Sequence, residues 1–61
     1  MKWTDFLFVD NVTGEEFLVE VHDTPDAQSE AEAIAQENFE EPKLICQMSD
    51  EEGEWLGLDT Y

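Results

Sequence analysis

The sequence contains no arginine and only two lysines, whereas 17 of its 61 residues are aspartate or glutamate. The formal net charge is therefore −15 at pH 7. Because so acidic a chain repels phosphate, the composition predicts no direct binding to DNA, RNA or an anionic membrane surface. The same charge attracts positively charged surfaces, so a basic protein is the partner that the composition favours.

Cysteines and long apolar runs are also scarce. Cys46 is the single cysteine, which excludes an internal disulfide and indicates a reducing compartment. No stretch approaches the roughly 20 apolar residues of a membrane-spanning helix, and the first residues lack the apolar run of a signal peptide. These absences predict a cytoplasmic protein, located in the host cytoplasm if the chain is encoded by a phage, with no membrane partner.

Residues that carry catalysis or bind metals are few. His22, the only histidine, stands at a predicted strand end with no nucleophile nearby, which is typical of an exposed side chain. Cys46 falls in a predicted buried strand without a basic neighbour, so we interpret it as a small hydrophobic residue. One histidine and one cysteine do not form an ordinary zinc site, and the acidic runs lack the spacing of a calcium loop. The sequence therefore predicts no enzyme, no cofactor, and no catalytic or metal-binding residue.

Two segments rich in β-branched and aromatic residues, 3–9 and 16–22, predict a β-hairpin. The residues between them fit a three-residue loop, with Asn11 opposite Glu15 and Gly14 in the left-handed conformation. This loop places Val9 opposite Phe17 and Leu7 opposite Val19. That loop length determines which residues share a face of the sheet, because side chains alternate along a strand. The predicted helix-facing set is Leu7, Val9, Phe17, Val19 and Val21.

A helix is predicted over residues 26–39, with Thr24 as its N-cap and Pro25 at its first position. Small or apolar residues recur along one stripe of this segment, which is the side expected to face the sheet: Ala27, Ala31, Ile34, Ala35 and Phe39. Pro42 ends the helical pattern, because proline disfavours the helical conformation in the residue before it.

The segment 43–48 predicts a third strand, with Leu44, Cys46 and Met48 on the core face. A capping-box pattern at 49–52 then predicts a helical turn that runs to about Leu56, with Gly57 as its C-cap. The expected fold is a single small acidic α+β domain over residues 1–61. Its order is β-β-α-β, with a three-stranded antiparallel sheet in the order 2-1-3, one helix on one face and a short C-terminal helical turn.

The second face of this sheet also carries apolar residues, which need a cover. Leaving several such side chains exposed would be a large loss for a small domain, because burying each one stabilises by roughly 1.5–3 kcal/mol. We therefore expect Trp55, Leu56 and Leu58 to fold back over the second face. The alternative is an apolar interface with a second copy or a partner, formed by Phe6, Phe8, Leu18, Trp55 and Leu56.

Acidic residues form a row along one flank of the predicted helix, with no basic residue interspersed. Like charges four residues apart repel each other mildly, so a chain selected for stability alone would be expected to place some lysines there. A second acidic run follows the third strand. The partner-binding residues predicted from these two sets are Asp26, Glu30, Glu37, Glu40, Glu41, Asp50, Glu51, Glu52 and Glu54.

These features favour a small interaction protein that imitates the charge of nucleic acid and inhibits a basic DNA- or RNA-handling protein. Small size, high acidity and no catalytic residues suit an inhibitor of the kind that phages or mobile elements encode. The alternative is a structural or accessory domain that forms a homodimer through the second sheet face, its acidity serving solubility. Adaptation to high salt also produces acidic surfaces, but it fits less well with a chain that has no arginine and keeps four phenylalanines and two tryptophans.

Overall fold

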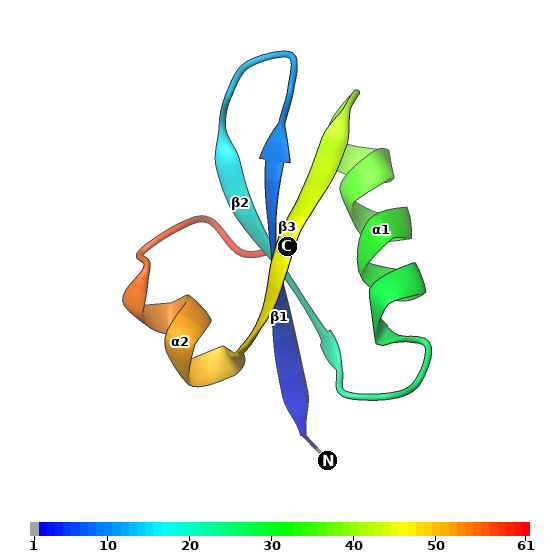
Figure 1. Cartoon of the computed structure of the whole chain (residues 1–61), viewed down its shortest axis with the longest axis vertical. Coiled ribbons are helices and arrows are strands. Elements are labelled where there is room, and N and C mark those ends of the chain that lie inside the picture. The colour runs from blue at the N-terminus through cyan, green and yellow to red at the C-terminus, as the bar shows by residue number, and fades with distance from the viewer. Residues whose placement is uncertain (1) are drawn as a thin grey trace.

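The computed structural model describes residues 2–61, which form three strands and two helices. Along the chain the elements are β1 (Trp3–Asp10), β2 (Glu16–His22), α1 (Ala27–Asn38), β3 (Pro42–Ser49) and α2 (Asp50–Trp55). The sheet is antiparallel, with the order β2-β1-β3. Figure 1 shows α1 on one side of the sheet and α2 on the other. The α+β fold, the strand order and the short C-terminal helix predicted from the sequence are confirmed.

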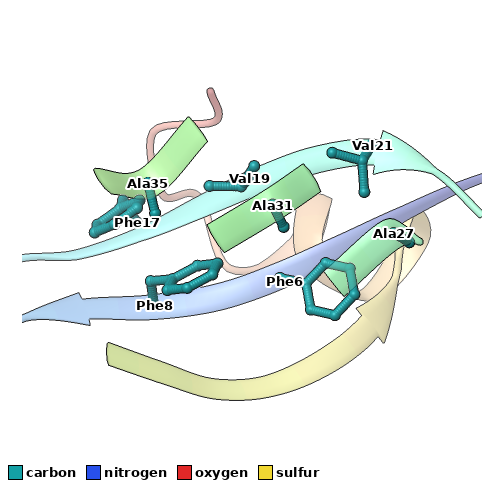
Figure 2. Packing of buried hydrophobic residues seen from close by; sticks show 8 residues of the cluster. All are labelled: Phe6, Phe8, Phe17, Val19, Val21, Ala27, Ala31 and Ala35. Atoms are coloured by element: carbon teal, nitrogen blue, oxygen red, sulfur yellow. The ribbon is translucent and has the colours of Figure 1, made fainter. Parts of the chain in front are cut away.

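The main hydrophobic core lies between α1 and the sheet (Figure 2). Ala27, Ala31 and Ala35 recur every four residues and are buried, so the backbone of α1 can lie close to the strands. The strand residues of this core are Phe6, Phe8, Phe17, Val19 and Val21, with Ile34, Phe39 and Leu44 packed around them. The apolar stripe predicted for the helix is therefore confirmed as its buried face.

Aromatic rings close one end of this core. Phe17 is completely buried and stacks on Phe39, with ring centroids 3.8 Å apart, and on Phe8 at 5.5 Å. Tyr61 meets the rings of Phe17 and Phe39 edge-on. The edge-on contacts of Tyr61 have a favourable geometry for aromatic pairs. The last residue of the chain thus contacts the hairpin and the segment that follows α1.

The register of the hairpin differs by one residue from the prediction. Phe8 pairs with Phe17 and Phe6 with Val19, where Val9 and Leu7 were expected. A shift of one residue moves every side chain of a strand to the opposite face of the sheet. The residues of β1 that face α1 are therefore Phe6 and Phe8, and Leu7 and Val9 lie on the second face.

The cause is a loop of four residues instead of three. The Asp10 N–H donates to the Glu15 carbonyl (2.8 Å), and the Gly14 N–H donates to the Asp10 carbonyl (2.7 Å). Gly14 has the predicted left-handed conformation, with φ at 75°. The buried Asp10 carboxylate accepts hydrogen bonds from the Val12 N–H (3.1 Å) and the Thr13 hydroxyl (3.3 Å). These bonds hold the chain in the longer loop.

A bulge in β3 overturns the predicted alternation of the third strand. Phe8 pairs with Leu44 and Leu7 with Cys46, so Ile45 is an extra residue without a partner on β1. Leu44 packs against the core as predicted, but Met48 is only half-buried and Cys46 is exposed. The interpretation of Cys46 as a buried hydrophobic residue was wrong, because the bulge turns it away from α1.

Both helices end within one residue of the prediction, α1 at Asn38 and α2 at Trp55, with Leu56 and not Gly57 as the C-cap of α2. The start of α1 lies later than predicted. Its N-cap is Asp26, not Thr24, because residues 24–27 form a separate turn closed by a bond from the Ala27 N–H to the Thr24 carbonyl (3.1 Å). At the start of α2, the Ser49 hydroxyl accepts a hydrogen bond from the Glu52 N–H (3.3 Å), as the capping box predicts. Gly57, which follows this helix, has φ at 65°.

The residues after α2 cross the second face of the sheet and pair with the outer edge of β2. The Leu18 N–H donates to the Asp59 carbonyl (2.9 Å), and the Tyr61 N–H donates to the Leu18 carbonyl (2.8 Å). The Leu18 side chain is buried, whereas Trp55 is 81% exposed. The expectation that Trp55 covers this face was wrong. The chain end instead pairs with the backbone of β2 at Leu18 and Glu20, which protects the edge of that strand.

Candidate functional site

The surface of the protein is dominated by carboxylates. Of the 17 acidic side chains, 14 are exposed, Glu32 is half-buried, and Asp5 and Asp10 are buried. Both lysines of the sequence, Lys2 and Lys43, are also exposed. Even if each lysine paired with one carboxylate, most of the exposed acids would stay unneutralised.

The two acidic sets predicted as partner-binding lie on opposite sides of the sheet (Figure 1). Gly53 of α2 packs on Asp5, which alternates along β1 with Phe6, a core residue beneath α1. All nine predicted side chains are exposed: Asp26, Glu30, Glu37, Glu40, Glu41, Asp50, Glu51, Glu52 and Glu54. A partner that docks on one side of the sheet therefore contacts one set and not the other.

The structure separates the five residues predicted as an apolar interface. Phe6 and Phe8 are buried beneath α1, and Leu18 is buried at the point where the backbone of β2 pairs with the chain end. Only Trp55 and Leu56 are exposed, by 81% and 47%. Both stand at the end of α2, beside the acidic residues of that helix.

One carboxylate stands apart from the solvated acids. The Asp5 side chain is only 3% exposed, and its Oδ1 atom has no hydrogen-bond partner within residues 2–61. It lies directly against the backbone of α2, because a side chain at Gly53 would collide with its carboxylate and come within 2.9 Å of its Cγ. Gly53 is therefore the residue that lets α2 lie on β1.

Other acids surround Asp5. Burial, and after it the negative charges of Glu20, Asp50 and Glu54, together raise the pKa of Asp5 from its usual 3.8 to about 6. Glu20 comes from β2, whereas Asp50 and Glu54 are one helical turn apart on α2. Three elements thus place four carboxyl groups together.

These four carboxyl groups and Thr60 line a cavity of about 340 Å³. Asp5 is the one buried residue among the five, so it forms the floor, and the others form the exposed rim. A larger, shallower groove of about 740 Å³ lies between the start of β1 and the first turn of α2, and Trp3 and Asp50 are among its lining residues. Asp50 thus borders both hollows.

Among residues 2–61, no three histidine, cysteine, aspartate or glutamate side chains converge in the way that a metal ion needs. The helices in this part of the chain are too short or too polar to cross a membrane. His22, which was predicted to be exposed, is half-buried, and its ring lies 4.0 Å from that of Trp3.

The sequence reasoning missed Asp5, Glu20 and Thr60 as members of a site. A signal was present, because Asp5 is an acidic residue inside a strand that is otherwise mostly apolar. Its surroundings, however, depend on the packing of α2 and on the return of the chain to β2, which no local pattern encodes.

Comparisons with protein-family models, with curated proteins and with solved structures found no match.

The density of charge predicts a stability that depends on salt. The molecule measures 33 × 24 × 15 Å. At 0.01 M salt the Debye length is about 30 Å, so almost every pair of carboxylates interacts, whereas at 0.15 M it is about 8 Å. We expect the melting temperature to rise by roughly 4–8 °C over this range, which corresponds to about 1 kcal/mol. A thermal melt followed by circular dichroism measures it.

The control for this prediction is the same salt series at pH 3, where most carboxylates are protonated and the rise should largely disappear. A melting temperature that stays flat at pH 7 would contradict the interpretation, because the charges would then be too dispersed to act as a field.

Proposed function

We propose that this chain is a non-enzymatic interaction protein that binds a basic protein through its acidic surface. The observation that supports it is the excess of exposed carboxylates, which two lysines cannot neutralise. Like charges held close together on a folded surface lower stability, so an external positive partner is the natural source of compensation.

The α2 side of the sheet fits this role better than the α1 side. It combines the acidic residues of α2 with a tryptophan, Trp55, that is 81% exposed at the end of the same helix. Aromatic residues, and tryptophan above all, are enriched among the residues that contribute most to binding energy in protein interfaces. The acidic row on α1 lacks such a residue and acts mainly through long-range attraction, which raises the association rate.

The basic partner is a protein that handles DNA or RNA, since its nucleic-acid site is the positive surface that an array of carboxylates can occupy. In this proposal the chain acts as a nucleic-acid mimic and inhibitor, of the kind that a phage or mobile element encodes, and it meets its target in the cytoplasm. The second candidate is a structural or accessory domain that forms a homodimer. With Phe6, Phe8 and Leu18 buried, Trp55 and Leu56 are the two residues of the predicted apolar interface that stay exposed for such a dimer.

A matched pair of charge reversals tests which face binds. Glu51→Lys with Glu54→Lys alters α2, and Glu30→Lys with Glu37→Lys alters α1. Each double variant adds four units to the net charge of −15 and gives −11, so total charge is the same in both. All four residues are exposed, so neither variant should disturb the fold.

We expect the α2 variant to weaken binding to the captured basic protein by on the order of 10-fold or more, mainly through faster dissociation. The α1 variant should change chiefly the association rate and its dependence on salt. Affinity capture from a lysate identifies the protein, and surface plasmon resonance with the purified protein gives both rates. An equal loss in the two variants would show that net charge alone drives binding, and recovery of the chain alone would favour the homodimer.

A further inference from the structure

A buried acceptor that lacks a donor lies at the floor of the cavity beside α2. Asp5 lies at its floor with 3% of its surface exposed, and its Oδ1 atom has no hydrogen-bond partner in the described part of the chain, residues 2–61. A buried carboxylate oxygen without a donor is costly, because the group has lost its hydration and gained nothing in return. A ligand that brings donors into the cavity would remove this cost.

The lining of the cavity defines the chemistry of that ligand. Its walls consist of four carboxyl groups and the Thr60 residue, so acceptors outnumber donors and the local charge is strongly negative. A metal ion is disfavoured, since no three potential ligand side chains among residues 2–61 converge on one point. A guanidinium group carries five N–H donors, no acceptor and a charge spread over a plane, so one such group can donate to several carboxylates at once.

We propose that this cavity receives an arginine side chain of the basic partner, whose guanidinium donates hydrogen bonds to the Asp5 carboxylate. The inference rests on the proposed function, because it names the group of the partner that the acidic surface recognises. Glu20 from β2 and two residues of α2, Asp50 and Glu54, surround the same guanidinium and attract its positive charge. Figure 1 shows the chain end returning from α2 to the sheet. Thr60, in this segment, pairs with Leu18 of β2 and also lines the cavity.

Binding of this kind depends on the ionisation of Asp5. Its pKa is raised to about 6, first by burial and then by the three acids that face it, so the carboxyl group is mostly ionised at pH 7.5 and mostly protonated at pH 5. A protonated Asp5 offers the guanidinium less charge and one acceptor fewer. Affinity should therefore fall as the pH is lowered through 6, a range in which exposed carboxylates with ordinary pKa values stay ionised.

The test is an NMR titration of the ¹⁵N-labelled full chain with N-acetyl-L-arginine amide. The control ligand is N-acetyl-L-citrulline amide, which has nearly the same shape but no charge. We expect the arginine compound, and not the citrulline compound, to shift the amide signals of Asp5, Glu20, Gly53 and Thr60 in a saturable way. Equal shifts with both compounds, or shifts spread evenly over the acidic surface, would overturn the proposal.

Two variants separate the cavity from general attraction. Asp5→Asn should lower the affinity for the arginine compound by about 10-fold or more and remove its pH dependence around pH 6. Glu54→Gln, at an exposed position that tolerates substitution, should lower it by about 2- to 5-fold. Glu15→Gln, in the hairpin loop and outside both acidic sets, is the matched control and should leave it unchanged. If all three variants bind equally, the cavity is not the site.

The experiments distinguish failure of the arginine site from failure of the proposed function. If the arginine compound binds in the cavity but no basic protein is captured, the site stands and the biological role is wrong. If a basic protein binds through α2 while the arginine compound leaves the cavity signals unchanged, the role stands and the arginine pocket is wrong.

Discussion

Replacing Phe17 by alanine is expected to unfold most of the chain at 25 °C. Phe17 is completely buried and contacts the rings of Phe8, Phe39 and Tyr61. Truncation of a buried phenylalanine to alanine costs about 3–5 kcal/mol. A 61-residue domain has a total stability of only about 3–9 kcal/mol, so this single change removes a large share of it. Far-UV circular dichroism at 25 °C would show the loss of structure.

Two variants make this result interpretable. Phe17→Leu keeps part of the volume and should leave enough structure for a urea titration that measures the loss of free energy. Trp55→Ala removes an aromatic side chain that is larger but 81% exposed, so its unfolding midpoint should stay close to that of the wild type. A large destabilisation by Trp55→Ala, with little effect of Phe17→Leu, would contradict the packing described above.

The second large effect is a stabilisation. Asp5→Asn should raise the free energy of unfolding at pH 7 by up to about 3 kcal/mol, since the pKa of Asp5 rises from 3.8 to about 6 on folding and each unit corresponds to about 1.4 kcal/mol. The folded state binds the proton of Asp5 more tightly than the unfolded state does. The contribution of this group to stability is therefore fully present below pH 3.8 and is lost as the pH rises through 6.

Urea titrations at several pH values between 4 and 7.5 measure this effect as the difference between variant and wild type. The difference should be small at pH 4, increase towards pH 6 and level off above it. Glu15→Gln removes an exposed carboxylate from the hairpin loop and should give a difference without this rise. A gap between Asp5→Asn and the wild type that is the same at pH 4 and pH 7 would show that Asp5 titrates normally.

The elements of the fold were predictable because each has a local cause. The alanine stripe of α1, the serine cap of α2 and the apolar runs of the strands all act within a few residues, so pattern and structure agree. The hairpin register was not predictable at this level. A glycine in the left-handed conformation closes both three-residue and four-residue loops, and only the side-chain bonds of Asp10 identify the longer one.

The candidate site was harder to predict, because it depends on contacts between distant parts of the chain. The cavity is lined by residues from four segments: Asp5, Glu20, Asp50 and Thr60. These residues meet only when Gly53 allows α2 to lie on β1. The bulge at Ile45 has a similar character, since it turns Cys46 away from the core without any signal in the strand pattern. The composition predicted the large negative net charge, but it did not predict which carboxyl groups lie together in the cavity.

The most direct test of the proposed function is competition with nucleic acid. The basic protein recovered by affinity capture is loaded with fluorescently labelled duplex DNA or RNA, and the acidic chain is added while fluorescence anisotropy is followed. We expect the chain to displace the nucleic acid stoichiometrically. Glu51→Lys with Glu54→Lys should abolish the displacement, and a higher salt concentration should weaken it. A ternary complex, in which the basic protein holds the chain and the nucleic acid together, would contradict the account.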